Sequence, residues 1–486
     1  MKRGALALAG LLAASRLLAG ATITIVNTDL ASQGLNDPTP AAPVGGNTGT
    51  TVGEQRLIAL QEAAAIWGSL LDSPIEIRIR VRFTALSCDD NTAVLAQTAP
   101  TQFLADFVPT PGFPGPVAPG TWHAVALANR RSGVDLLPSA DDISVTINSN
   151  IGLSSCGFTW YYGLDDNHGG SIDLMTTMLH EYAHGFGFLT PVSSSGAEFL
   201  GKPDLFETYI LDDSTGKLWP EMTDAERAAS AINTGQLVWA GEAVTDTVPA
   251  VLRGAPVLTA SAPAAGNYAI GLAEFGPAPT EAGVSGTLVA ALDPSDAAGP
   301  STFDACSPVT NGSALSGKIA LIDRGLCTFV SKTLNVQAAG AIAAVIADNV
   351  DGPVAGMGGT DPSVTIPAVR VTKADGATLR AAIDGGVTVW IHLDPSHRSG
   401  ADSSGRLMLY APNPYLGGSS ISHWDTSVYP DLLLEPTIAF DLGQGVDLTL
   451  PALRDLGWYP DIPAREPTTP VHRTDVTKKV GPRPPD

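Results

Sequence analysis

The most regular pattern in the chain lies at residues 75–83, where apolar and charged side chains alternate. Apolar residues occupy the odd positions, and Glu or Arg occupies each even position. Successive side chains of a strand point to opposite faces, so this pattern predicts a strand with one face in the core and one in water. A shorter alternation predicts a strand at residues 22–26, and residues 158–162 are predicted to form another.

Two further segments carry apolar residues at the three- and four-residue spacing of a helix. The first spans residues 57–67, between the first two strands. The second spans residues 172–184; Ser171 or Asp173 can cap its start, and Gly185 follows its end. The resulting strand-helix-strands-helix order predicts an α+β domain whose sheet covers the second helix.

The pattern changes between about residues 245 and 396. We expect strands at 318–323, 341–347 and 366–371, and helices at 329–339 and 374–383. This β-α-β order predicts a small sheet with helices packed against it. Residues 397–460 are irregular up to a last predicted helix at 448–456, and the Pro-rich, polar tail at 461–486 is predicted to be disordered.

The first 21 residues have the pattern of a secretory signal peptide. Lys2 and Arg3 precede an apolar Ala/Leu run, and Ala19-Gly20-Ala21 forms a small-x-small cleavage site. The run is too short to span a membrane, and no later stretch reaches 18 uninterrupted apolar residues. We therefore expect a secreted, soluble protein with no membrane span.

The four cysteines agree with an oxidising compartment. Cys88 and Cys156 lie early and Cys306 and Cys327 lie late, which favours one local disulfide in each region. Four cysteines allow three connectivities, and their order alone does not choose among them.

Charge narrows the range of partners. The formal net charge is -22, and removal of the signal, with its three basic and no acidic residues, would bring it to -25 (-22 minus 3). Such acidity opposes binding to nucleic acid or to an anionic membrane. The length of 486 residues favours two or three domains.

The second predicted helix ends in the chain's most specific chemical motif, His180-Glu181-Tyr182-Ala183-His184. Residues four apart lie on one helix face, so both imidazoles can reach one metal ion. Zinc binds imidazole nitrogen and leaves a position open for water in catalytic sites, and Glu181 is placed to act as general base on that water. The alternative is a pair of hydrogen-bonded core histidines, but burying Glu181 beside them is costly unless a cation is present.

The middle region contains small, basic and aromatic residues at a characteristic spacing. They are Gly317, Lys318, Ile319, Arg324, Gly325, Cys327, Phe329, Lys332, Asn335, Gln337, Ala339-Gly340-Ala341, Ile366-Pro367-Ala368-Val369 and Asp375-Gly376. This set resembles the protease-associated (PA) domain over about 150 residues. The resemblance implies a non-catalytic, β-rich α/β sandwich inserted in a secreted peptidase, where it contacts substrate or partners or serves as a spacer.

The flanking segments resemble a zinc metallopeptidase of the metzincin type. His180, Glu181, His184 and Gly187 match the motif H-E-x-x-H-x-x-G-x-x-H, but Thr190 occupies the last His position. Leishmanolysin-like metzincins bring that third His from far downstream, in a His-Trp-acidic sequence. The resemblance thus implies His423, in Ser422-His423-Trp424-Asp425, as the third zinc ligand. It also implies a Met turn beneath the metal, for which Leu434 is the candidate, and a closing helix at 448–458.

A different ligand scheme remains open. In gluzincins, the third ligand is a Glu on a following helix, and four glutamates lie within reach: Glu198, Glu207, Glu221 and Glu226. None of them has the E-x-x-x-D context usual for that scheme. We interpret the remaining histidines as ordinary surface or loop residues: His123, His168, His392, His397 and His472.

These patterns together predict a split metzincin-like zinc peptidase domain interrupted by a PA domain. The expected boundaries are a signal peptide at 1–21, peptidase segments at 22–244 and 397–460, a PA insert at 245–396 and a tail at 461–486. Disulfides Cys88–Cys156 and Cys306–Cys327 then each lie within one domain.

The predicted function is a secreted zinc (Zn²⁺) endopeptidase that acts on protein or peptide substrates, with Trp160-Tyr161-Tyr162 as a possible edge for extended substrate. The alternative is an exported PA-domain binding or adhesion protein whose metal site is structural or decayed. Retention of Glu181 argues against it, because a structural site has no use for a general base.

Overall fold

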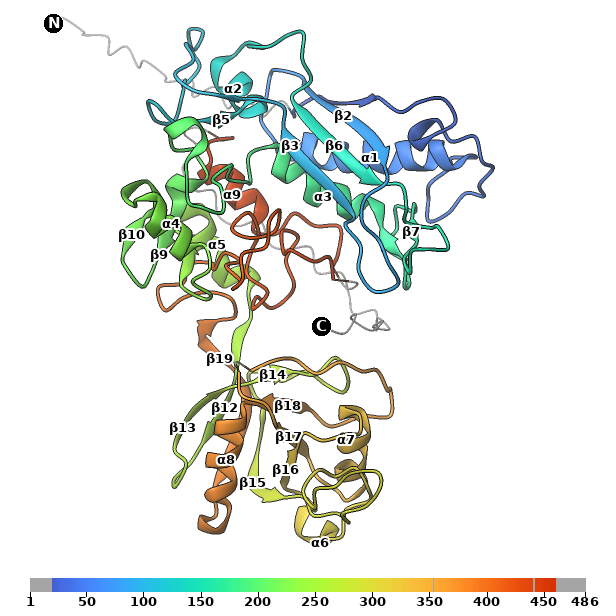
Figure 1. Cartoon of the computed structure of the whole chain (residues 1–486), viewed down its shortest axis with the longest axis vertical. Coiled ribbons are helices and arrows are strands. Elements are labelled where there is room, and N and C mark those ends of the chain that lie inside the picture. The colour runs from blue at the N-terminus through green and yellow to red at the C-terminus, as the bar shows by residue number, and fades with distance from the viewer. Residues whose placement is uncertain (1–19, 353, 440–441, 460–486) are drawn as a thin grey trace, which may run out of the picture.

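A computed structural model describes residues 20–352, 354–439 and 442–459. Most of the predicted signal peptide and the tail from 461 onward, with His472, lie outside these residues. The chain forms two lobes connected by strands β12 (Gly254–Ala260) and β19 (Thr388–Arg398) (Figure 1). Within the described residues, no helix is long and apolar enough to cross a membrane.

The larger lobe is built on a four-stranded sheet with the order β1-β2-β6-β3. Strands β1 (Ile23–Asn27), β2 (Ile77–Thr84) and β6 (Ile143–Asn148) run parallel, and β3 (Ala96–Pro100) runs antiparallel to β6 at the end of the sheet. In β2 the odd positions from 77 to 83 are buried, as the alternation predicted.

Two helices cover one face of this sheet (Figure 1). Helix α1 (Val52–Leu70) begins with a capping box formed by Thr51 and Glu54, and it packs against α3 (Leu174–Gly185). The other elements of this lobe are η1 (Gly34–Asn36), β4 (Phe103–Leu104), β5 (His123–Ala124), α2 (Val125–Ser132), β7 (Trp160–Tyr161), β8 (Ile172–Asp173), η2 (Phe199–Gly201), η3 (Glu207–Tyr209), β9 (Ile210–Asp212), β10 (Lys217–Leu218), η4 (Trp219–Glu221), α4 (Asp224–Ser230), β11 (Leu237–Trp239), α5 (Glu242–Val251) and α9 (Thr449–Asp455).

The strand expected at 158–162 differs from the prediction. Only Trp160 and Tyr161 form strand β7, which pairs with β8 outside the four-stranded sheet. The end strand is instead β3, whose sequence Ala-Gln-Thr-Ala-Pro has no apolar alternation. The position of β3 is fixed by its pairing with β6, which is a tertiary contact that local pattern does not show.

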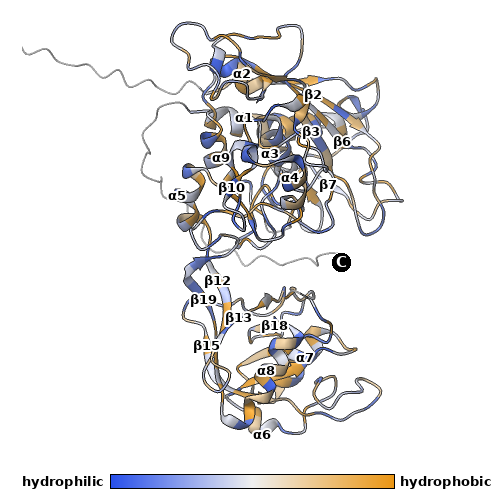
Figure 2. Ribbon diagram, turned by 60° about the vertical axis from the view of Figure 1, so that its left-hand side comes forward, coloured by the Kyte–Doolittle hydropathy of each residue, from blue (hydrophilic) through white to orange (hydrophobic). Residues whose placement is uncertain are grey.

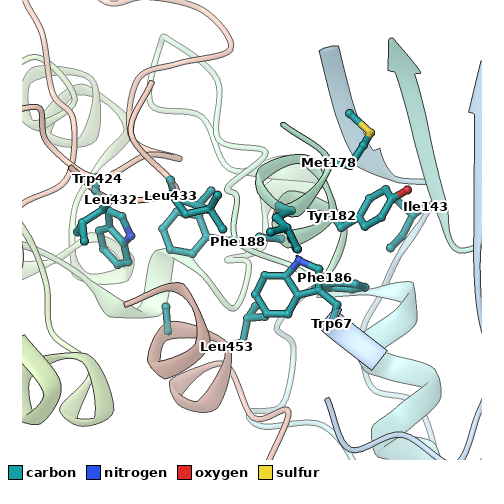
Figure 3. Packing of buried hydrophobic residues seen from close by; sticks show 14 of the residues in the cluster. Trp67, Ile143, Met178, Tyr182, Phe186, Phe188, Trp424, Leu432, Leu433 and Leu453 are labelled. Atoms are coloured by element: carbon teal, nitrogen blue, oxygen red, sulfur yellow. Dashed lines mark hydrogen bonds between the residues drawn. The ribbon is translucent and has the colours of Figure 1, made fainter. Parts of the chain in front are cut away.

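One continuous core joins the two halves of the larger lobe. Its aromatic contacts include Trp67 with Phe186 at 5.5 Å, Phe186 with Trp458 at 5.6 Å, and Phe188 with Trp424 at 4.7 Å between ring centroids. Figure 3 shows Trp67, Phe186, Phe188 and Trp424 in this core, together with Leu433 and Leu453 from the C-terminal segment. The residues after the smaller lobe are therefore part of the same hydrophobic core as α1 and α3.

The smaller lobe is an eight-stranded sheet with the order β13-β12-β19-β15-β16-β17-β18-β14. Strands β15 to β18 are parallel, and both faces of β16 to β18 are buried, one under α7 and the other under α8. Figure 2 shows hydrophobic segments gathered around these helices. The bounds are β13 (Gly266–Ala269), β14 (Gly271–Leu272), β15 (Val284–Ala290), α6 (Gly312–Leu315), β16 (Ile319–Asp323), α7 (Phe329–Ala338), β17 (Ala343–Ala347), β18 (Ala368–Val371), α8 (Lys373–Ala381) and η5 (Ile383–Gly385).

Each lobe contains one of the two disulfides that the structure forms. Cys88 pairs with Cys156 in the larger lobe, and Cys306 pairs with Cys327 in the smaller one. Both pairs are those expected from the sequence.

The last helix supplies a cap to α5. The Asp455 carboxylate accepts hydrogen bonds from the Ala243 and Val244 backbone N–H groups, at 2.8 and 3.2 Å, and from the Trp239 indole N–H at 3.0 Å. Two of these donors belong to the first turn of α5, whose own preceding residue, Gly241, has no side chain to cap it.

We predict that Asp455→Ala lowers the free energy of unfolding by about 2 kcal/mol, because three donors lose their acceptor. Urea denaturation followed by tryptophan fluorescence measures the change. Asp246→Ala removes an exposed carboxylate from the same helix and should alter stability by less than about 0.5 kcal/mol. Equal effects of the two substitutions would contradict a capping role for Asp455.

Candidate metal centre

Helix α3 carries His180, Glu181 and His184 into the interior. Asp173 caps its start by accepting hydrogen bonds from Met175 N at 2.8 Å and Thr176 N at 3.3 Å. All twelve residues of α3 are buried. At its end, a Cβ on Gly185 would lie 2.5 Å from the Ile143 side chain, so only glycine allows α3 this close to β6.

The structure brings His423 to the two histidines of α3. The Nε2 atom of His180 lies 3.1 Å from that of His184 and 3.3 Å from that of His423, and the ligand atoms of all three lie within 4.8 Å of one another. Their exposed fractions are 6%, 8% and 5%. A chain segment 239 residues after His184 (423 minus 184) therefore completes a compact triad.

Each of the three rings is oriented by a backbone carbonyl. The Nδ1 atoms of His180, His184 and His423 lie 2.7, 2.8 and 2.7 Å from the carbonyl oxygens of Leu433, Phe188 and Ser419. A carbonyl only accepts, so Nδ1 must carry the proton in each ring, and each neutral ring then presents an Nε2 lone pair. Three acceptors therefore face one another without a proton between them.

This donor set fits a zinc ion. Nitrogen ligands about 2.05 Å from a tetrahedral zinc lie about 3.3 Å apart, close to the two observed Nε2 separations. Burial lowers the pKa of His180 to about 3 and that of His184 to about 4, and it holds the pKa of His423 well below its ordinary value. The rings are thus neutral at pH 7, as metal ligands must be.

A turn at residues 432–435 lies beneath this triad. Leu433 provides the carbonyl that orients His180, and its N–H donates to the Asp447 carboxylate at 2.5 Å. The Glu435 carboxylate accepts from Leu432 N at 2.7 Å, and the Leu434 carbonyl accepts from Trp424 N at 2.7 Å. The turn is therefore held on several sides, and it contains Leu434, the candidate for the Met-turn position.

Glu181 lies on the side of α3 that faces strand β3. Its exposed fraction is 7%, and burial raises the pKa of its carboxyl to about 7, with a small opposing contribution from the Thr98 hydroxyl of β3. Bound zinc would favour the ionised form of this carboxyl through its positive charge. Glu181 is thus a buried carboxyl close to the three histidines, and a carboxyl so placed can accept and return a proton.

The four glutamates of the alternative scheme lie elsewhere. Glu198 pairs with Arg227 at 3.2 Å, Glu221 accepts from Leu218 N at 3.0 Å, and Glu226 pairs with Lys217 at 2.6 Å. Glu207 is buried beside Asp204. Among the described residues, the one group of His, Cys, Asp and Glu close enough to hold a metal is the His180, His184 and His423 triad.

Two other histidines were wrongly interpreted as surface or loop residues. His123 is fully buried in β5, with Nδ1 2.9 Å from the Thr121 carbonyl oxygen and Nε2 accepting from Val117 N, and burial lowers its pKa to about 4. His392 is buried in β19 and stacks on Trp390. His168 lies in a loop, and His397 is exposed and contacts Asp394.

Comparison with known proteins identifies the smaller lobe. The PA domain family matches residues 284–379. The chain contains a PA domain. The match confirms the resemblance drawn from the sequence, and the matched residues include β15 to β18, α7 and most of α8.

Two curated relatives match this chain over 90 and 102 residues, about the length of the PA-domain match. "Probable lipoprotein aminopeptidase LpqL" of Mycobacterium tuberculosis is 44% identical over 102 residues, which is 20% of this chain and 19% of that protein. "ER degradation-enhancing alpha-mannosidase-like protein 3" of Xenopus laevis is 39% identical over 90 residues, which is 17% of this chain and 10% of that protein. The chain thus spans less than a fifth of the length of either relative.

Among solved structures, an aminopeptidase from Aneurinibacillus sp. strain AM-1 is 25% identical and covers 30% of this chain and 31% of its own, with a TM-score of 0.23. At that TM-score, the likeness carries no argument about the larger lobe.

We predict that His423→Ala lowers zinc affinity by at least about 100-fold, because it leaves two imidazoles where a catalytic zinc normally has three protein ligands. Competition with a chelating dye measures the affinity. His397→Ala is the matched control and should change affinity by less than twofold, since that side chain is exposed in the smaller lobe. Unchanged affinity in His423→Ala would exclude it as a ligand.

Proposed function

We propose that this protein is an exported zinc endopeptidase of the metzincin type, with a PA domain inserted in its catalytic domain. The observation that carries the proposal is the convergence of three buried, proton-free Nε2 atoms beside the carboxyl of Glu181. A structural zinc site closes its coordination with four protein ligands, whereas three ligands and a neighbouring carboxyl are the composition of a catalytic site.

His180, His184 and His423 would hold the zinc ion. When bound, zinc polarises a substrate carbonyl and makes a neighbouring water more acidic. The backbone carbonyls behind the three rings fix their orientation, so the ligands are arranged before the metal arrives.

Glu181 would act as general base and then as general acid. Its carboxylate takes a proton from the water that attacks the scissile carbonyl and passes that proton to the departing amine. A carboxyl performs both steps best when its pKa lies near the working pH. The mostly buried setting of Glu181 keeps bulk water from competing for that proton.

Strand β3 is the proposed edge for extended substrate. It ends the four-stranded sheet, packs against α3, and carries Thr98 beside Glu181. A peptide that pairs with such an edge continues on both sides of the cleaved bond, which favours endopeptidase action. Cleavage of peptides blocked at both ends tests this, because an aminopeptidase requires a free amino terminus.

The domain division also remains a proposal, with one refinement. The expected boundary at 245 falls inside α5, which packs against α9 in the larger lobe. Gly254, the first residue of β12, pairs with Arg398, the last residue of β19. The chain therefore enters and leaves the smaller lobe at adjacent points. We place the insert at 254–398, and the two disulfides support an oxidising, extracytoplasmic location.

We predict that Glu181→Gln lowers peptidase activity by at least about 100-fold while one zinc stays bound per chain, because the carboxylate acts on water rather than on the metal. Casein and blocked-peptide digestion, together with metal analysis of the same sample, measure both quantities. Activity within tenfold of the wild type would refute the mechanism, and absence of phenanthroline-sensitive activity in the wild type would favour the binding-protein alternative.

We predict that replacing residues 255–397 with a short Gly/Ser linker leaves a folded, zinc-binding core that cleaves small peptides. The adjacent ends at Gly254 and Arg398 need only a short connection, and the smaller lobe has hydrophobic clusters of its own. Metal analysis and peptide cleavage by the shortened chain provide the measurement. Loss of zinc binding would show that the insert is integral to the catalytic fold.

A further inference from the structure

Two carboxyl groups that the proposed mechanism does not use are buried together beyond the end of α3. Asp204 is 2% exposed and Glu207 is fully buried. Neither Glu207 oxygen meets an N–H or O–H donor, and the polar group beside it is the Asp204 carboxyl. Two ionised carboxylates cannot share a dry site without strong repulsion, so this contact requires a proton or a cation.

The hydrogen bonds show which carboxyl carries the charge. Asp204 accepts from the Thr190 hydroxyl at 2.6 Å and from Glu207 N at 3.0 Å, so donors stabilise its ionised form. Glu207 lacks such donors. Burial and the neighbouring Asp204 charge raise the pKa of Glu207 well above its ordinary value. The arrangement therefore favours a neutral Glu207 carboxyl beside an ionised Asp204 carboxylate.

Asp204 is connected to the triad through the loop that follows α3. The Thr190 hydroxyl donates a hydrogen bond to the Asp204 carboxylate, and the Thr190 backbone N–H donates to the Ser422 hydroxyl at 3.2 Å. Ser422 directly precedes His423. The same loop provides the Phe188 carbonyl that orients His184. The loop thus contacts the segments of two of the three proposed ligands.

We propose that Asp204 and Glu207 share one proton, and that this proton holds the loop at residues 186–192 in the position that aligns His184 and His423. Both carboxyls are positioning residues, since they act through Thr190 and Ser422. This inference rests on the proposed function, because the alignment matters only if the triad binds a metal.

Few other charges reach the pair. Glu198 adds negative charge near Glu207 and is itself paired with Arg227 of α4. Of the elements packed against η3, β10 carries Lys217, which pairs with Glu226, and η4 carries Glu221, whose carboxylate accepts from Leu218 N. No described cation in these elements forms an ion pair with Glu207 itself.

The sign of the pH effect follows from the raised pKa of Glu207. The folded protein keeps a proton that the unfolded chain releases near the ordinary glutamate pKa of about 4.3. Folding stability from this group is complete below that pH and is lost as the pH rises toward the raised value. Alkaline conditions should therefore loosen the pair and the loop that it holds.

The first test measures thermal unfolding of the metal-free full chain, in excess chelator, from pH 6 to pH 10. Glu207→Gln keeps a neutral, hydrogen-bonding side chain, so its Tm should fall less with pH than that of the wild type. Glu62→Gln, the same change at an exposed position of α1, should follow the wild type. Equal slopes for Glu207→Gln and the wild type would overturn the shared proton.

A rise in wild-type Tm on adding calcium chloride, absent in Glu207→Gln, would also overturn it and would assign the pair to a cation. The calcium effect can be told apart from the pH effect, because the pH series contains excess chelator and therefore no free divalent metal. The thermal series does not depend on zinc, so it tests the proton even if the proposed function fails.

The second test measures zinc affinity by chelator competition at pH 7 and pH 10. Hydroxide competes for zinc equally in both proteins, so the ratio of wild-type to Glu207→Gln zinc affinity removes that effect. This ratio should be about tenfold lower at pH 10 than at pH 7. Asp204→Ala should lower affinity about tenfold at pH 7. A constant ratio would overturn the positioning role, whereas a wild type that binds no zinc would refute the proposed function itself.

Discussion

The larger lobe depends on one constraint, which is that three imidazole lone pairs meet in a nearly dry interior. Each neutral ring donates its single N–H to a backbone carbonyl, so none of the three facing Nε2 atoms can donate a hydrogen bond to another. Buried acceptors without partners destabilise a fold unless a cation satisfies them. The triad is therefore best explained as a site that a metal ion completes. The contacts around it then serve to hold the three rings in place.

Those supporting contacts explain why the chain returns after the PA domain. His423 reaches the triad because the neighbouring Trp424 ring packs against Phe188 and Trp239. The backbone N–H of Trp424 also donates a hydrogen bond to the Leu434 carbonyl. The same turn orients His180 through Leu433. The C-terminal segment thus contributes the third histidine of the triad, an orienting carbonyl and part of the core. The PA domain can be inserted because Gly254 and Arg398, its two junctions, are strand neighbours.

Sequence reasoning succeeded where the information was local. The spacing in α3, the alternation in β2 and the β-α-β pattern of the PA domain each reflect the geometry of a single element or pair. His423 came from a resemblance, because no periodicity links it to residues 239 positions earlier. Strand β3 and the anchor Asp447 were missed because their roles are defined by partners distant in sequence, and β3 lacks an apolar alternation. The buried His123 and His392 were misread because a single histidine carries no pattern.

The proposed mechanism requires that His180, His184 and His423 bind one zinc ion together. Zinc K-edge X-ray absorption of the full chain loaded with one zinc tests it most directly. We expect three imidazole nitrogens at about 2.0 Å and one further oxygen ligand. A ligand shell with only two imidazoles, or one completed by sulfur or a fourth imidazole, would contradict it.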